Sequence, residues 1–152
     1  MCSDQYKIAK EHMKLTTNDL KRMTPYVRRM INDKTLLKIV QDYRVIAEAV
    51  HVEHCGAGIE VGDNYVFDLF GTVKPEESTA PNICTFALAP MVGFFYMSTD
   101  HATTGHDPVS IAALPFECLD TGIGHGGVGK VKFILHVKKA KDRKSVRKRE
   151  PL

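Results

Sequence analysis

Alternation of apolar and polar residues predicts the strands of this chain, and it is clearest near the C-terminus. Within residues 129–137, Val131, Phe133, Leu135 and Val137 recur at every second position, so they share one face of a predicted strand. Three further segments are rich in β-branched or aromatic residues and are bounded by turn-forming residues. We expect strands at residues 43–52, 64–70 and 115–120.

A different period predicts helices in the first part of the chain. Leu20, Met23, Val27 and Met30 follow helical spacing, and Thr24-Pro25 offers an N-cap followed by proline at the first helical position. We expect two or three short helices here. A second apolar stretch, residues 82–98, predicts a central helix that bends near Pro90.

Together these elements predict an α+β fold: a small, mainly antiparallel sheet with one central helix, preceded by a helical N-terminal arm. The expected organisation is an arm at residues 1–41, a core domain at 42–137 and a basic tail at 138–152. The chain has 152 residues, of which 43% are hydrophobic and 26% charged, which is typical of one globular domain.

Charge is distributed unevenly along the chain. The net charge is +3, yet residues 138–152 hold eight Lys or Arg and two Asp or Glu, so the rest of the chain is mildly acidic. The tail lacks interleaved aromatic residues for base stacking, so we do not expect nucleic acid as a partner. A solubilising tail and a tail that docks onto a protein partner both fit.

The N-terminus has no signal-peptide pattern, and no stretch reaches the ~18 apolar residues of a membrane helix. We therefore expect a cytoplasmic protein that does not enter a membrane. In that compartment the four cysteines, which are Cys2, Cys55, Cys84 and Cys118, should be free thiols or metal ligands instead of disulfides.

Candidate ligands gather at the predicted ends of strands and helices. His54 and Cys55 follow the first strand, Cys84 begins the central helix, and Cys118 falls in the short third strand. A thiolate at a helix start would gain from the helix dipole. Asp120 ends this strand and His125 lies in the loop that follows; with His54 they are the candidates for proton transfer.

Three cysteines and one histidine match a tetrahedral zinc site or a cysteine-rich iron site, because thiolates hold these soft ions well. The candidate metal ligands are therefore Cys55, Cys84, Cys118 and His54. Since the chain has no Cys-x-x-Cys pair, two alternatives stay open. The cysteines could be buried structural thiols, or one could be a reactive nucleophile.

Residues 121–129 contain five glycines, but the loop runs into a strand instead of a helix. Nucleotide-binding glycine loops run into a helix whose N-terminus holds the phosphate, so this loop is interpreted as a hairpin or a lid near the site.

The segment from about Tyr43 to Lys138 resembles a widespread family of small, largely uncharacterised prokaryotic proteins that are frequent in anaerobes. The resemblance rests on the Cys-x-x-Gly-x-x-x-Gly-Asp motif at residues 55–63, then on Ile83-Cys84 and on Cys118-Leu119-Asp120. It implies that the three cysteines are family positions. The family often has proline after its first two cysteines, where this chain has Gly56 and Thr85.

These observations favour an accessory subunit of a larger cytoplasmic metabolic enzyme complex, with a zinc or iron site and with a protein partner or a homo-oligomer. The alternative is a small lyase or decarboxylase that uses the Cys/His site.

Overall fold

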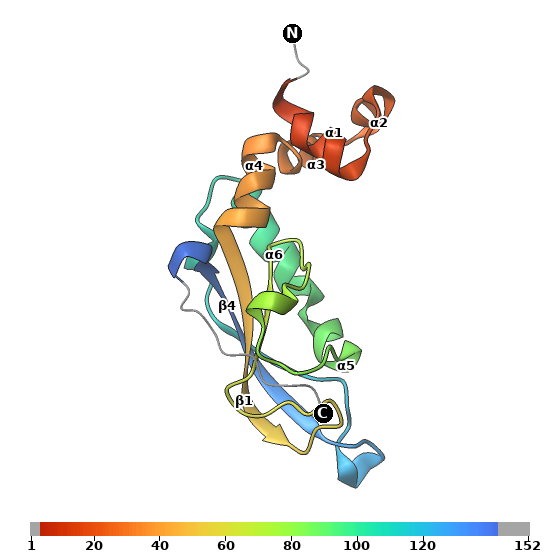
Figure 1. Cartoon of the computed structure of the whole chain (residues 1–152), viewed down its shortest axis with the longest axis vertical. Coiled ribbons are helices and arrows are strands. Elements are labelled where there is room, and N and C mark those ends of the chain that lie inside the picture. Colours follow the sequence, from red (N-terminus) through yellow and green to blue (C-terminus); the bar gives the residue numbers. More distant parts are fainter. Residues whose placement is uncertain (1–3, 143–152) are drawn as a thin grey trace.

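The computed structural model describes residues 4–142, which form an α+β fold with one antiparallel sheet (Figure 1). The strand order is β2-β1-β4-β3, and all pairings are antiparallel. The strands are β1 (Tyr43–Glu53), β2 (Asn64–Phe67), β3 (Leu114–Glu117) and β4 (Lys130–Lys139). The predicted fold class is confirmed.

The N-terminal region is helical, as its spacing predicts. Thr16 and Asp19 form a capping box at the start of α2, and the Thr24 hydroxyl accepts from the N–H of Val27 at the start of α3, where Pro25 is the first residue. There are more helices than the two or three expected. They are η1 (Asp4–Tyr6), α1 (Lys7–Met13), α2 (Thr17–Arg22), α3 (Pro25–Met30), α4 (Asp33–Leu37) and the π-helix η2 (Lys38–Asp42).

These helices enclose a small core of their own, in which Ala9, Ile31 and Leu36 are buried. Val40 and Phe70 pack against both this small core and the main one. Figure 1 shows that the arm projects beyond the end of the sheet where β1 begins.

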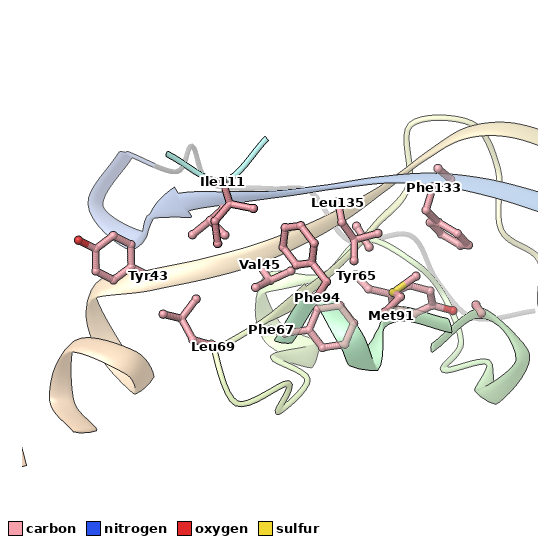
Figure 2. Close-up of a cluster of buried hydrophobic side chains, with 14 of the residues drawn as sticks. Tyr43, Val45, Tyr65, Phe67, Leu69, Met91, Phe94, Ile111, Phe133 and Leu135 are labelled. Carbon is pink, nitrogen blue, oxygen red and sulfur yellow. The ribbon is translucent and has the colours of Figure 1, made fainter. Parts of the chain in front are cut away.

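The main core lies between the sheet and the central helices, where side chains from β1, β2 and β4 meet Met91 and Phe94 (Figure 2). Val131, Phe133, Leu135 and Val137 all point into it, as their alternation predicts. The remaining elements are η3 (Pro75–Glu77), α5 (Thr85–Leu88), η4 (Ala89–Met91), α6 (Val92–Thr103), η5 (Pro108–Ser110), η6 (Ile123–His125) and η7 (Ala140–Asp142).

Several predicted boundaries differ from the observed ones. The second strand ends at Phe67 because the buried Asp68 accepts from the N–H groups of Phe70 and Thr72 and turns the chain. The central helix is broken at η4, which contains Pro90, and then continues to Thr103, past the predicted end at residue 98. The third strand is shorter than expected, since it ends before Cys118.

The last strand continues two residues beyond its predicted end, so Lys138 and Lys139 belong to β4 instead of a tail. Residues 143–152 of the predicted basic tail lie outside the described residues. Across the part of the chain that the structure describes, no helix combines the length and the apolar character that a membrane crossing needs.

Candidate functional site

Cys55 is positioned by a tight turn after β1. The strand ends at Glu53, and His54 then takes a left-handed conformation with φ 57°. The N–H of Gly58 donates to the carbonyl of Cys55 over 3.1 Å, and Gly58 itself has φ 73°. Because left-handed backbone favours glycine, this position explains the first glycine of the Cys-x-x-Gly motif.

The Gly-Asp half of the same motif ties the segment back to β1. The N–H of Gly62 donates to the carbonyl of Ala49, and the N–H of Ala49 donates to the carbonyl of Asp63, both over 2.8 Å. The Asp63 carboxylate accepts from the N–H of Glu60. The motif is therefore a closed turn that holds Cys55 beside the sheet.

Cys84 is the N-cap residue of α5 and faces the turn that carries Cys55. Tyr65 on β2 donates its hydroxyl to the carbonyl of Asn82 over 2.7 Å, and the Asn82 side chain donates to the carbonyl of Ala57 over 3.0 Å. Burial is the main cause that raises the pKa of Tyr65, to about 12. The phenol therefore acts as a neutral donor that joins the two cysteine segments.

The sequence predicts that the dipole of a long central helix acts on Cys84. The helix that begins there, α5, has only four residues and continues into the 3₁₀ turn η4, so that long helix is not present.

Cys118 comes directly after β3, and it remains bound to β4. Its N–H donates to the carbonyl of Val131 over 2.9 Å, and the N–H of Val131 donates to the Cys118 sulfur over 3.2 Å. The next residue, Leu119, donates its N–H to the carbonyl of Phe86 on α5. These bonds join the third cysteine to the segment that carries the second.

The three thiols line one cavity of about 380 Å³, together with His54 and Asp120. It lies at the end of the molecule opposite the N-terminal helices, where the end of β1, α5 and the start of β4 meet (Figure 1). All three cysteines are half-buried and free. Within residues 4–142, however, no three His, Cys, Asp or Glu side chains are grouped closely enough to hold a metal ion.

Asp120 stabilises the glycine-rich loop. Its carboxylate accepts from the N–H groups of Gly122 (2.9 Å) and Val128 (3.1 Å), and these bonds, the one from Gly122 first, lower the pKa of Asp120. A Cβ on Gly127 would collide with this carboxylate and would lie 2.7 Å from the amide nitrogen of Gly122. The loop is thus a folded turn around a carboxylate, and its last residues, Val128 and Gly129, line the cavity.

His125 is exposed on η6 and is not among the residues that line the cavity, so the structure does not bring this candidate to the thiols. The apolar part of the cavity wall could not be recognised from the sequence. Ile59, Ile83, Phe86 and Val131 are part of it, and in the sequence nothing separates such residues from those of an ordinary core.

The fold and the site define an α+β protein with a cavity lined by three free thiols. Comparisons with family models, with curated proteins and with solved structures gave no match.

Proposed function

We propose that this chain is an accessory subunit of a larger cytoplasmic metabolic enzyme complex and that it holds a zinc or ferrous ion through Cys55, Cys84 and Cys118. The supporting observation is that these three residues, which come from three separate segments, line one cavity. Thiolates are among the protein ligands that bind zinc and iron. His54 lines the same cavity and is the candidate for the fourth ligand.

Metal binding requires a local rearrangement. A zinc–sulfur bond is about 2.3 Å long, so the three sulfur atoms must approach one another closely. Cys55 lies in a turn and Cys84 at a helix cap, where side-chain rotation leaves the strand pairing intact. Each thiol must also lose its proton, so the affinity should increase with pH.

The test is an anoxic titration of the reduced full-length protein with zinc or ferrous ion, in competition with a chromophoric chelator. We expect one ion per chain, tighter binding at about pH 8 than at about pH 6, and release of protons on binding. Changing Cys55, Cys84 or Cys118 singly to Ser should weaken binding roughly tenfold or more. Cys2→Ser is the control, because Cys2 is not one of the proposed ligands. Binding that no pocket substitution weakens contradicts the metal site.

The accessory role is supported by the surface around the cavity. Ile83, Phe86, Leu119 and Val128 expose 57–60% of their area, although all are large and apolar. Ile83, Phe86 and Val128 line the cavity itself, and Leu119 is bonded to α5 through Phe86. Large apolar side chains that gather at one place on a surface are typical of a protein interface.

Purification from the native host under anoxic conditions, followed by light scattering on the sized fractions, tests this role. We expect a complex with another protein or a homo-oligomer. Phe86→Ser should release the free chain, whereas Val109→Ser, at an exposed valine outside the cavity, should not. Recovery of the parent only as a free monomer contradicts the accessory role.

A small lyase or decarboxylase is the second candidate, and the conformation of His54 favours it. His54 is one of two non-glycine residues with positive φ between residues 4 and 142, and such strained residues are frequent at active sites. Assay of a panel of small 2-oxo acids for release of carbon dioxide tests this candidate. It predicts turnover that His54→Ala abolishes, and turnover that is unchanged in this variant contradicts it.

A further inference from the structure

A second cavity, of about 700 Å³, lies between the N-terminal arm and the core. Helix α3 supplies one wall through Tyr26, Val27 and Met30. Helices α5 and α6 and residues 67–71 supply the opposite walls. This volume is in the range of small-molecule sites, which is about 300–1,000 Å³.

The floor of this cavity is preformed by aromatic packing. The Phe95 ring lies edge-on to Phe67, with 4.9 Å between the ring centroids, and Phe67 is only 1% exposed. The Phe95 ring also lies against Gly71, where a Cβ would approach the ring to 2.9 Å. Gly71 also has φ +86°, so both the backbone conformation and the space require glycine there.

The chemistry of the lining restricts the ligand. None of the residues that line the cavity is charged, and its polar side-chain groups are all hydroxyls, from Tyr26, Thr85, Tyr96 and Thr99. The Thr99 hydroxyl already donates to the carbonyl of Leu69 over 2.7 Å. A charged ligand would lose its hydration here without gaining an ionic partner. The lining therefore fits an uncharged molecule that is mostly apolar and has few hydrogen-bonding groups.

We propose that this cavity binds an uncharged, predominantly apolar small molecule. The proposal does not rest on metal binding at the thiols, because the two cavities have different linings and share only Thr85. The shared residue, Thr85, directly follows Cys84 in the chain.

The probe for the test is N-phenyl-1-naphthylamine, an uncharged aromatic dye whose emission increases in apolar surroundings. Titration of the full-length protein should give saturable binding of one dye per chain. Val92→Trp places a large ring at the mouth of the cavity, on a residue that is 51% exposed, and should weaken binding at least tenfold. Val109→Trp is the matched control, because Val109 is 42% exposed and does not line the cavity. It should change the affinity less than twofold.

Thermal unfolding of both variants shows whether each remains folded. The natural chain contains no tryptophan, so each variant carries a single indole. Energy transfer to bound dye should be more efficient from the indole of Val92→Trp than from that of Val109→Trp, which gives a second report of the dye's position. Absence of saturable binding to the parent, or an equal loss of affinity in both variants, overturns the proposal. So does a concentration-dependent dimer of the parent that Val92→Trp abolishes, because the cavity would then be a subunit interface.

Discussion

Gly129 lines the thiol cavity, and even one added carbon there should destabilise the fold. It precedes β4 and passes so close to the end of β1 that an added Cβ would meet backbone atoms. That Cβ would collide with the carbonyl oxygen of His54 and would lie 2.5 Å from the His54 carbonyl carbon and 2.7 Å from the Glu53 oxygen. These distances are roughly an ångström short of ordinary van der Waals contact.

The atoms that a Cβ on Gly129 would meet cannot turn away, because all three belong to the backbone. Relief requires the end of β1 to separate from the start of β4, where Glu53 pairs with Lys130. Overpacking usually costs about 1–3 kcal/mol, and a backbone collision belongs at the upper end, so we expect Gly129→Ala to cost about 3 kcal/mol. For a chain of this size that corresponds to a decrease in Tm of roughly 6–12 °C.

Thermal unfolding followed by circular dichroism measures this change, and urea unfolding checks that the m-value is unchanged. Gly124→Ala is the control from the same loop, because no heavy atom lies within 4 Å of its Cβ position. Its effect should be within about 0.5 kcal/mol. If Gly129→Ala unfolds within about 2 °C of the parent, the close approach of the two strands is not as the structure has it.

Three other changes test separate parts of the fold. Burial lowers the pKa of His136, so below about pH 6.5 the unfolded chain binds more protons than the folded chain and the folded state loses stability. The Tm should therefore decrease less between pH 7 and pH 5 in His136→Gln than in the parent. An equal decrease in both proteins refutes this. Asp68→Ala removes an ion pair with Lys74 and two hydrogen bonds to backbone N–H groups, and it should cost about 3 kcal/mol in urea unfolding. Glu117→Ala, which removes two exposed ion pairs, should change the free energy of unfolding by less than about 1 kcal/mol. Gly93 lies in α6, and no heavy atom is within 4 Å of the position that its Cβ would take. Because alanine favours helix more than glycine does, Gly93→Ala should raise the free energy of unfolding by about 0.5–1 kcal/mol. A decrease in this free energy contradicts the open space at Gly93.

Much of the sheet could be predicted because its signal is local. Val131, Phe133, Leu135 and Val137 alternate because one face of β4 is buried, so the period identifies both the strand and its inward face. His136 lies on the opposite face of β4. Alternation alone predicts an exposed side chain there, yet the Nε2 of His136 is buried and has no hydrogen-bond partner among the described residues.

The candidate site could be predicted only in part, because its assembly depends on long-range pairing. The sequence identified Cys55, Cys84 and Cys118 as candidates, but their spacing does not fix their separation in space. Cys118 reaches the cavity because it is bonded to Val131, and Cys55 because the Gly-Asp turn returns to β1. His125, only five residues after Asp120, stays outside because the loop folds around the Asp120 carboxylate.

The larger cavity follows from the way in which the N-terminal region buries its apolar residues. Its helices bury Ala9, Ile31 and Leu36 in a core of their own. Burial of these side chains therefore does not depend on packing against the main domain. Only a few residues, among them Val40 and Phe70, pack against both cores. Two cores joined by so few contacts leave space between their surfaces, and that space has apolar walls because each wall is the outer layer of a core. In the sequence these wall residues are indistinguishable from core residues, so the cavity becomes visible only when the two parts are placed together.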